Sequence, residues 1–511
     1  MRTLAFILMA GPALAGEPVF VDRSADLPLE HVYSGGWEHF VGGGVAVMDC
    51  DADGFPDLFA AGGEAPARLF RNATGVPGAP VTFETAELPE ITRATGAYPL
   101  DINGDGWLDL FVLRVGPNMA LKGGPGCRFE DATEAWGIAT GDTWSTAFTA
   151  TWEDGQDRPT LAIGNYVDRT DPDGPFEACD DNTLLRPGSG GYGDPVRLSP
   201  GYCALSILFS DAARRGTADL RVSNDRHYYV RGGSEQMWKM PELDILGPED
   251  GWAAVSIWGM GIASEDITGD GLPEVVLTSM GDQLLQYATG GFGFRTAPYS
   301  TGATAHRPHI GDDGRPSTGW HAEFGDIDND GRADIFIAKG NVDQMPTNAM
   351  RDPNSLLMQE PDGSFREASV AAGVASMHRA RGAALSDLNR DGRLDIVVVN
   401  RRAPMEVWEN AGETGNWVTL LPRQEGPNGF AIGGWVELRD GSGTVRTKEL
   451  TVGGGHAGGE AGPVHFGLGD AARVDVRMLW PDGTASDWIT LEANRHAELW
   501  RDGGRLALRA Q

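Results

Sequence analysis

The chain has 511 residues, of which 41% are hydrophobic and 22% charged, so its composition is that of a folded protein rather than a disordered one. Asp and Glu number 73 against 41 Lys and Arg, which gives a formal net charge of −32. This excess of acid argues against nucleic acid and anionic membrane surfaces as partners, because both select basic patches. Glycine accounts for 72 residues without a collagen period, so we expect many tight turns and a β-rich fold.

The first fifteen residues are typical of an export signal. Arg2 supplies positive charge, Leu4–Met9 is apolar, and residues 13–15 (Ala-Leu-Ala) form a small-x-small cleavage site. No later apolar run approaches the ~18–20 residues of a membrane-spanning helix. We therefore expect residues 1–15 to be removed and the mature protein to be exported, to the periplasm or the extracellular space, with no membrane span.

Four cysteines follow, and an oxidising compartment permits them to form disulfides. Four cysteines allow three pairings. Cys179 and Cys203 flank one long segment rich in Gly and Pro, so we favour a bridge between them. Cys50 and Cys127 then pair by elimination.

One nine-residue pattern recurs along most of the chain. It has Asp at position 1, Asp, Asn or Thr at position 3, Asp at position 5, Gly at position 6 and Asp or Glu at position 9. The five copies are residues 49–57, 101–109, 266–274, 326–334 and 387–395. Small and apolar residues precede each copy, and a short apolar run, mostly β-branched or aromatic, follows it. The repeating unit is therefore a buried strand, a loop and a second buried strand.

The chemistry of this loop is that of a calcium site. Oxygen ligands at positions 1, 3 and 5 surround a hard cation, Gly at position 6 permits the sharp turn, and position 7 offers its backbone carbonyl. A carboxylate at position 9 closes the shell, whereas an EF-hand needs Glu at position 12, which is apolar in all five copies. We predict about five structural calcium ions. The predicted side-chain ligands are Asp49, Asp51, Asp53, Asp57, Asp101, Asn103, Asp105, Asp109, Asp266, Thr268, Asp270, Glu274, Asp326, Asp328, Asp330, Asp334, Asp387, Asn389, Asp391 and Asp395. The predicted carbonyl ligands are Phe55, Trp107, Leu272, Arg332 and Arg393.

Two further units keep the frame without the ligands. Residues 211–219 preserve positions 1, 6 and 9 but place Arg214 and Arg215 where the cation would lie, and residues 152–160 are fainter still. With these the units start at 49, 101, 152, 211, 266, 326 and 387, a period of 51 to 61 residues. This period fits seven four-stranded blades around a channel. The N-terminal segment Phe20–Ser24 resembles the last strand of other units, so we expect it to complete the seventh blade and close the ring.

The remaining C-terminal residues predict a separate β-sandwich. Alternating strands such as 417–421, 434–438, 474–479 and 497–500 are separated by Asp-Gly turns at 440, 482 and 502. We therefore divide the chain into an export signal at 1–15, a seven-bladed propeller at 16–412 and a small sandwich at 413–511.

These patterns resemble known families. The loops at blade spacing are similar to the FG-GAP/VCBS repeats of the propeller of integrin α-subunits, over about residues 17–412. Residues 416–502 resemble the ASPIC/UnbV domain, through pieces such as 432–436 (Ile-Gly-Gly-Trp-Val), 465–469 (His-Phe-Gly-Leu-Gly) and 480–483 (Trp-Pro-Asp-Gly). Trp435 stands where that pattern usually has a basic or small residue. Together the two parts resemble the cartilage acidic protein family, which implies the fold and the calcium at the five intact loops far better than an activity.

The sequence leaves the function open. We favour a binding or scaffolding protein with a protein or glycan partner; the rival hypothesis is an enzyme that acts on a carbohydrate or small metabolite at the channel mouth, and a third is a subunit of an envelope complex. No GxSxG, HExxH, Walker or dinucleotide motif is present, and we assign no catalytic residue. The candidate ligand face consists of His306, His321, His378 and Arg381, which precede the loops of the last two blades.

Overall fold

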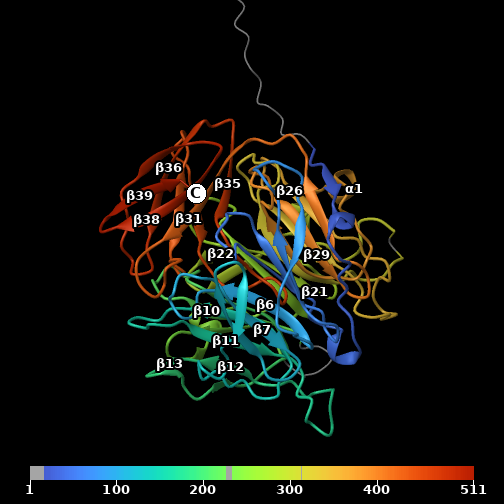
Figure 1. Ribbon diagram of the computed structural model, residues 1–511. Helices are drawn as coiled ribbons and strands as arrows, with labels where there is room; N and C mark the ends of the chain where they lie inside the picture. The colour runs from blue at the N-terminus through green and yellow to red at the C-terminus, as the bar shows by residue number, and fades with distance from the viewer. Residues whose placement is uncertain (1–16, 226–232, 312, 511) are drawn as a thin grey trace, which may run out of the picture.

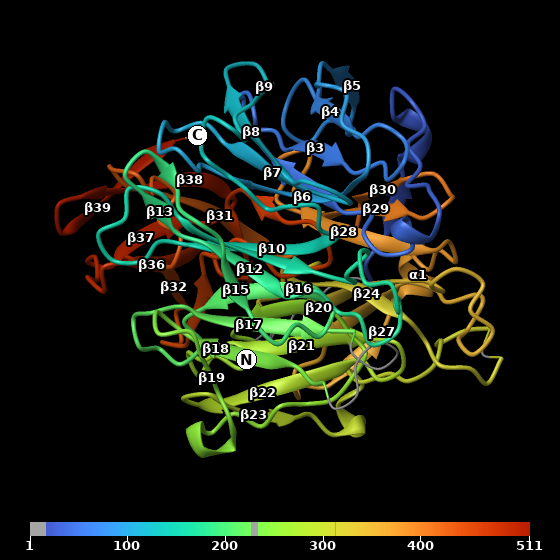
Figure 2. The same ribbon diagram turned by 90° about the horizontal axis from the view of Figure 1, so that it is seen from below.

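The computed structural model describes residues 17–225, 233–311 and 313–510, so the predicted export signal lies outside the described residues. The chain in these ranges is all-β, and its four-stranded sheets stand around a common axis with a second domain on one side (Figure 1, Figure 2). No helix in the described part is long and apolar enough to cross a membrane.

Seven sheets of the described chain are the blades, and in blades 1 to 6 the four antiparallel strands follow one another in chain order. Blade 1 contains β2 (Val45–Met48), β3 (Asp57–Ala60), β4 (Arg68–Asn72) and β5 (Phe83–Ala86), and blade 2 contains β6 (Ala94–Leu100), β7 (Asp109–Arg114), β8 (Met119–Gly124) and β9 (Arg128–Asp131). Blade 3 contains β10 (Ser145–Thr151), β11 (Thr160–Asn165), β12 (Asn182–Leu185) and β15 (Val196–Leu198), and blade 4 contains β16 (Ala204–Ser210), β17 (Asp219–Asn224), β18 (Gln236–Lys239) and β19 (Asp244–Ile245).

The remaining three blades complete the ring. Blade 5 contains β20 (Gly259–Glu265), β21 (Glu274–Ser279), β22 (Leu284–Gly290) and β23 (Gly293–Thr296), and blade 6 contains β24 (Gly319–Gly325), β25 (Asp334–Lys339), β26 (Ser355–Gln359) and β27 (Phe365–Glu367). Blade 7 contains β28 (Ala380–Ser386), β29 (Asp395–Asn400) and β30 (Glu406–Asn410). The short elements between strands are β13 (Pro187–Gly188), β14 (Gly191–Tyr192), helix α1 (Ser369–Ala372) and the 3₁₀ turns η1 (Ser24–Asp26), η2 (Trp37–His39), η3 (Pro248–Asp250) and η4 (Tyr299–Thr301).

The N-terminal strand closes the ring. Strand β1 (Phe20–Asp22) is the fourth strand of blade 7 and pairs antiparallel with β30, with Phe20 opposite Asn410 and Asp22 opposite Trp408. This confirms the predicted closure, in which the two ends of the propeller share one sheet and leave no open edge between first and last blades.

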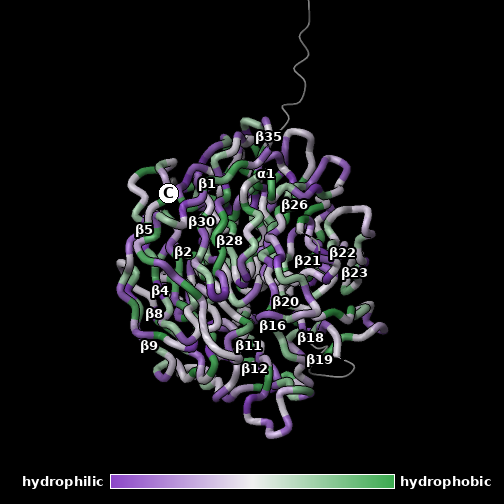
Figure 3. The backbone as a smooth tube through the Cα atoms, turned by 90° about the vertical axis from the view of Figure 1, so that its right-hand side faces the viewer, coloured by the Kyte–Doolittle hydropathy of each residue, from purple (hydrophilic) through white to green (hydrophobic). Residues whose placement is uncertain are grey.

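The first strand of each blade is buried along its length because it lies closest to the axis. All seven residues of β6, β10 and β16 are buried, and Gly, Ala, Ser and Thr predominate among them, since small side chains let neighbouring strands crowd together. Figure 3 shows hydrophilic segments among the outer turns of the molecule and hydrophobic stretches within it.

The C-terminal domain is the predicted sandwich. One sheet contains β31 (Asn416–Arg423), β35 (Val464–Gly469), β38 (Arg495–Asp502) and β39 (Arg505–Ala510), and the other contains β32 (Trp435–Arg439), β33 (Val445–Glu449), β36 (Arg473–Leu479) and β37 (Ile489–Glu492). The sheets share one apolar core that includes Val418, Val436 and Phe466. In Figure 1 this domain is red and lies at the upper left, against the propeller.

The sandwich sends a segment into the propeller channel, which the sequence analysis did not anticipate. This segment, residues 451–461, is called the plug here. It forms β-bridges with the first strands of blades 2 to 5, through Ala97, Ala150, Leu208 and Ile262, and its last residues, β34 (Glu460–Ala461), pair in parallel with β2 of blade 1. The plug therefore pairs with five of the seven blades.

Glycine permits this insertion. A Cβ atom added at Gly44 in blade 1 would lie 1.8 Å from the carbonyl oxygen of Ala457, and one at Gly96 in blade 2 would lie 1.7 Å from the same atom. A Cβ at Gly458 of the plug would lie 2.1 Å from the oxygen of Val45. Glycine is thus required on both sides, because any side chain at these positions would separate the plug from the strands.

We expect Phe20→Ala to destabilise the protein by about 3 kcal/mol, because Phe20 packs with Trp408 and Val398 in the core of blade 7 and large-to-small core substitutions cost roughly this much. Urea unfolding at constant calcium measures the change. Val21→Ala on the same strand is the matched control, since the Val21 side chain is exposed, and it should cost under about 1 kcal/mol. Equal losses for the two variants would contradict the closure role of Phe20.

Candidate metal centres

The nine-residue loops all lie at the same end of the propeller. Each loop joins the first strand of its blade to the second. Because the first strands of all blades run in the same direction along the axis, these loops lie at the same end. The loops are named here by their blades: loop 1 is 49–57, loop 2 is 101–109, loop 4 is 211–219, loop 5 is 266–274, loop 6 is 326–334 and loop 7 is 387–395. The faint unit at 152–160 likewise joins β10 to β11 of blade 3.

The carboxylate at position 1 organises each loop. In loop 1, Oδ1 of Asp49 accepts the backbone N–H of Asp53 at 3.1 Å and Oδ2 accepts that of Gly54 at 2.9 Å. The same two contacts, from positions 5 and 6, recur at 2.7–3.2 Å in the other five loops. Glycine at position 6 has a φ of 77–95° in all six loops, a left-handed conformation that favours this residue.

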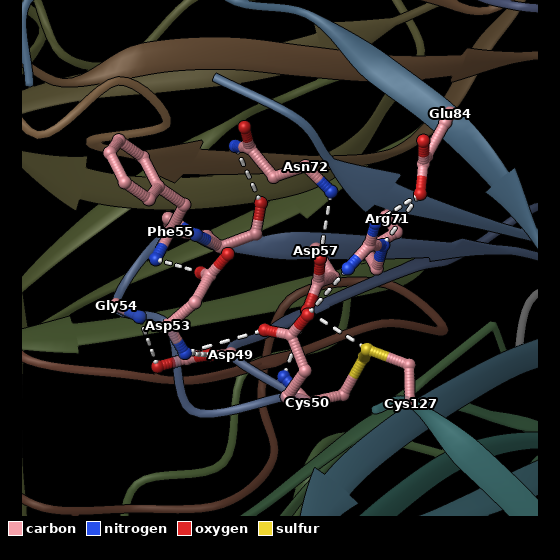
Figure 4. The surroundings of a disulfide bond; sticks show 12 residues. Asp49, Cys50, Asp53, Gly54, Phe55, Asp57, Arg71, Asn72, Glu84 and Cys127 are labelled. Carbon is pink, nitrogen blue, oxygen red and sulfur yellow. Dashed lines mark hydrogen bonds and ion pairs between the residues drawn. A yellow bond between two sulfur atoms is a disulfide. The ribbon is translucent and has the colours of Figure 1, made fainter. Parts of the chain in front are cut away.

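The carboxylate at position 9 joins the loop to the third strand of the blade. In loop 1, Asp57 accepts the N–H of Cys50, at position 2, and that of Asn72 in β4, both at 2.8 Å (Figure 4). The corresponding pairs of contacts in loops 2, 6 and 7 measure 2.8–2.9 Å. Position 9 therefore fixes the loop from the side opposite to position 1.

Oxygen atoms converge within this frame. Carboxylate oxygens of the Asp residues at positions 1, 3 and 5 of loop 1 all lie within 4.8 Å of one another, as do those of Asp326, Asp328 and Asp334 in loop 6. In loop 5, Oε1 of Glu274 is buried and has no hydrogen-bond partner among the described residues. Calcium is a hard cation that binds several oxygen ligands, mostly carboxylates and carbonyls. The side chains of these loops therefore fit calcium.

Burial raises the pKa values of the carboxyl groups at positions 1 and 9 of the five calcium-type loops, and neighbouring carboxylates raise them further. The pKa of Asp57 rises to about 8 and that of Asp49 to about 6. The pKa values of Asp109, Asp326 and Asp387 each rise to about 7. In every case burial, which penalises the charged form, is the largest cause. Each loop therefore needs either protons or a bound cation to balance its charge near neutral pH.

Positions 3, 5 and 7 complete the loop. The side-chain oxygen at position 5 accepts the N–H of position 7 in all five calcium-type loops, at 2.8–3.1 Å. In loop 1 the second oxygen of Asp51, at position 3, pairs with Nη1 of Arg71 at 3.1 Å. In loop 2 an oxygen of Asp105 pairs with Lys122 at 2.9 Å. Basic residues of neighbouring strands thus orient the more exposed ligands from outside.

Loop 4 keeps the frame but balances its charge with an arginine. Asp211 at position 1 accepts the N–H groups of Arg215 and Gly216 at 2.7 Å, as in the other loops. The Arg215 guanidinium, at position 5, donates to both oxygens of Asp219 at 2.6 Å. The side-chain cation of Arg215 therefore reaches the carboxylate at position 9 from a position where the other loops present another carboxylate.

Both disulfides have the predicted pairing. Cys50 is bonded to Cys127 and Cys179 to Cys203, and none of the described cysteines is unpaired. Because Cys50 is position 2 of loop 1 and Cys127 lies between β8 and β9, the first bond ties a nine-residue loop to the neighbouring blade (Figure 4).

The four residues of the candidate ligand face do not share one open surface. Arg381 is fully buried: Nε donates to the carbonyl of Phe40 at 2.9 Å, Nη1 to that of Ala380 at 2.9 Å, and the guanidinium lies 4.0 Å from the centre of the Trp320 ring. His321 is 3% exposed.

The other two histidines lie at the surface. His306 is paired with Asp282 at 2.6 Å and has a half-exposed side chain, and His378 is exposed. The buried pair and the exposed pair thus occupy different environments, and Arg381 and His321 hold structure.

The plug explains the burial of His321. Its Nδ1 accepts the backbone N–H of His456 at 3.0 Å, and Nε2 of His456 accepts the N–H of Gly42 at 3.2 Å. Burial lowers the pKa of His456 to about 3, so its ring is neutral and can serve as this acceptor. The sequence held one signal for such a segment. Residues 453–459 are mostly glycine, and a run of glycine is unfavourable inside a strand of a sandwich.

Two family profiles match the chain. The FG-GAP-like repeat matches residues 49–112, 266–337 and 326–398, and the ASPIC and UnbV domain matches residues 424–505. The first set falls on blades 1 and 2 and blades 5 to 7, and the second on the sandwich and plug. The chain is therefore an FG-GAP-repeat β-propeller protein with an ASPIC/UnbV domain.

Part of the chain is also similar to cartilage acidic protein 1. It is 26% identical to human cartilage acidic protein 1 over 162 residues, which cover 31% of this chain and 24% of the human protein. The Xenopus tropicalis protein of that name is 25% identical over 162 residues, 31% of this chain and 25% of that protein. The match thus spans about a quarter of the length of these curated relatives.

Solved structures share the propeller more distantly. The BP39L lectin from Burkholderia pseudomallei is 13% identical, with a TM-score of 0.48 over 73% of this chain and 97% of that chain. An Agrocybe aegerita lectin that recognises non-reducing terminal N-acetylglucosamine is 14% identical, with a TM-score of 0.39 over 70% of this chain and 88% of that chain. Likeness at this level says nothing about a ligand of this protein.

We expect Arg215→Met to destabilise the protein by about 2 kcal/mol, because it leaves the buried carboxylate of Asp219 without its partner. Denaturant unfolding measures this, and the loss should be the same with calcium and with a chelator, since loop 4 has its own cation. Arg473→Met is the matched control: Arg473 pairs with Glu492 at the surface, where ion pairs contribute at most about 1 kcal/mol. A loss that calcium restores would contradict the role given to Arg215.

Proposed function

We propose that the protein is an exported calcium-binding β-propeller that acts as a binding or scaffolding protein for a protein or glycan partner. The observation that carries the proposal is the set of loops 1, 2, 5, 6 and 7. Each holds at least three acidic side chains in one hydrogen-bonded frame and more acid than the neighbouring basic side chains balance, and in loops 1 and 6 three carboxylates lie within 4.8 Å of one another. Calcium, held by positions 1, 3, 5 and 9 and the carbonyl of position 7, would supply that balance and make each turn rigid. Its role is structural.

The state of the channel favours a scaffold over an enzyme. A reaction at the channel mouth would need convergent acid and base groups beside an open cavity. Here the plug lies within the channel, and Arg381 donates to the carbonyl of Phe40. A cavity of about 470 Å³ remains beside the plug, but the His321 ring that lines it is already bonded to the plug. We therefore place the partner surface on the other end of the propeller.

That end carries the features of a recognition surface. The segment between β11 and β12, residues 166–181, is pinned by the Cys179–Cys203 disulfide, and Phe176 within it is 64% exposed. Trp37, which precedes the first strand of blade 1, is 47% exposed. Exposed aromatic side chains on a rigid scaffold are typical of sites that bind proteins or sugars.

Two disulfides and a strongly acidic composition support export. Disulfides persist in oxidising compartments outside the cytoplasm, where calcium is also abundant enough to fill weak structural sites.

The first prediction of this proposal is a calcium count. Metal analysis after dialysis, with isothermal titration as a second measurement, should find about five ions per chain, because five loops carry the ligand pattern. Asp391→Asn in loop 7 should remove one ion by weakening a ligand at position 5. A wild-type count below three would contradict the assignment.

Stability should depend on pH in opposite ways with and without calcium. Without calcium, Asp49, Asp57 and Asp109 have folded pKa values of about 6, 8 and 7, above the unfolded value of about 3.9, so the folded state binds more protons. Their contribution to stability is therefore lost as pH rises from about 4 to 8. Calcium binds the ionised form, so its stabilising effect should grow over the same range. Thermal unfolding at pH 5, 6.5 and 8 with calcium or chelator tests this, and a calcium effect that is independent of pH would contradict it.

The partner is tested with the mature chain immobilised in calcium and probed with a glycan array and an envelope extract. We expect a saturable partner that is lost when residues 171–175, within the disulfide-pinned segment, are replaced by Gly-Ser residues. The same replacement at 440–443, a sandwich turn, is the matched control. Binding that survives the first replacement and fails with the second would place the partner site on the sandwich instead.

A further inference from the structure

The sandwich rests directly on the nine-residue loops. Two of its backbone N–H groups, at Gly415 and Gly469, donate to the carbonyl oxygens of Asp328 and Asn329 in loop 6, at 2.8 and 2.7 Å. Nη1 of Arg446 donates to the carbonyl of Gly331 in the same loop at 3.0 Å. Positions 3, 4 and 6 of loop 6 therefore all serve as acceptors for the other domain.

Loops 5 and 7 are held in a similar way. Nε2 of His465 lies 3.1 Å from the carbonyl oxygen of Gly392, and Nε2 of His496 lies 3.3 Å from that of Arg390, both in loop 7. In loop 5 the hydroxyl of Thr447 donates to Oδ2 of Asp266 at 3.3 Å, and Asp266 is the position-1 carboxylate. Lys448 adds an ion pair of 2.9 Å with Glu265, the residue that precedes this loop.

Loop 1 offers a contrast within the same molecule. Among the described residues, those of loop 1 make no hydrogen bond to the sandwich, although the loop has the same frame and a full set of acidic ligands. A side chain from loop 7, Arg390, lies over its Gly54 instead. Loops 1 and 6 thus differ in their contact with the sandwich more than in their own chemistry.

The carbonyl oxygens that accept hydrogen bonds from the sandwich are placed by the conformation of the loop. Position 4 is left-handed in loops 6 and 7, with φ of 57° at Asn329 and 58° at Arg390, which costs energy for a residue other than glycine. That conformation turns the carbonyls outward to the sandwich. Loops 1 and 4 have the same conformation, with φ of 63° at Ala52 and 52° at Arg214, so it belongs to the common frame. In loops 6 and 7 the carboxylates at positions 1 and 5 repel one another across this frame, and a cation between them would relieve that repulsion.

At blade 4 the attachment needs no metal. Glu449 of the sandwich accepts the N–H of Asp211 at 2.7 Å and the hydroxyl of Ser210 at 2.6 Å. The Arg214 guanidinium lies 3.3 Å from the centre of the Trp435 ring. Loop 4 is the loop whose charge is balanced by its own arginine, so this side of the interface is permanent.

We propose that the sandwich and its plug are the resident partner of loops 5, 6 and 7, and that calcium in these loops holds the two domains together. The proposal rests on the calcium binding proposed above. In this proposal the calcium loops of the last three blades have two roles: they stabilise their own blades, and they form the interface with the sandwich. Loss of calcium loosens the sandwich on the side of blades 5 to 7 and weakens the hold on the plug, while the contact at blade 4 and the plug's pairing with the first strands keep the domain tethered.

The test compares Asp330→Asn in loop 6 with Asp53→Asn in loop 1, in the full mature chain. Both residues occupy position 5, and in both the retained oxygen can still accept the N–H of position 7. Metal analysis counts the calcium ions, and hydrogen exchange followed by mass spectrometry measures protection of residues 453–459 of the plug and of strand β33. Exchange of strand β25 in blade 6 reports whether that blade stays folded.

We expect each variant to lose one calcium ion, and only Asp330→Asn to raise the exchange rate of the plug and β33, by about tenfold, the effect of weakening one or two hydrogen bonds. Equal protection in the two variants, with one ion lost from each, would overturn the inference and leave the calcium assignment intact. A wild-type protein that binds no calcium would overturn both.

A second pair of variants tests the interface without touching a calcium ligand. Arg446→Leu removes the contact with Gly331, whereas Arg439→Leu removes an arginine of the same domain that pairs with Asp475 inside the sandwich. With calcium bound in full, Arg446→Leu should increase exchange of the plug about tenfold and Arg439→Leu should not. If both variants keep the wild-type protection, the contacts of Arg446 do not hold the domains together and the proposed dock is wrong.

Discussion

The buried carboxylate at position 1 of each nine-residue loop is the contact on which the rest of the structure depends. It accepts two backbone N–H groups and so turns an acidic stretch into a tight link between two buried strands. A hydrogen bond to a charged group contributes about 1.5–3 kcal/mol, but burying the charge without compensation costs more. The loop geometry is therefore stable only where some positive charge is supplied, and loop 4 supplies it from Arg215. The hydrogen-bond frame is constant, and the source of the balancing charge varies.

Features set by local spacing could be predicted from the sequence, and those set by the meeting of distant segments could not. The loops, the seven-unit period and the N-terminal strand follow from patterns of nine and about fifty residues, and the structure confirms the blades and their closure. The plug has no periodicity, and its fit depends on Gly44 and Gly96 in blades far away in the sequence. The division of the candidate ligand face into buried and exposed residues could not be predicted for the same reason: nothing near His321 in the sequence indicates that His456 will reach it.

Two departures from the repeat patterns meet at the domain interface. Trp435 replaces the basic or small residue usual in the sandwich motif, and loop 4 has Arg214 where loops 2 and 5 have glycine. In the structure the guanidinium of Arg214 lies on the ring of Trp435 and also donates to the carbonyl of Gly271 at 2.7 Å. Each residue looks like an exception when its own domain is considered alone, and together they form one stacked contact that joins blade 4 and loop 5 to the sandwich.

The plug and the loops together decide which surface is left for another molecule. The sandwich contacts loops 4 to 7 at one end of the propeller and the plug occupies the channel beneath it, with a cavity of about 470 Å³ left between them and the loops. The opposite end, where connections of variable length enter the blades, and the outer rim are covered by neither. Insertions there leave the first strands and the loop frame unchanged, because those strands are already fixed at the loop end by the two carboxylates. The end of the propeller that carries the loops therefore holds the fold together, and the opposite end can vary in sequence and in what it binds.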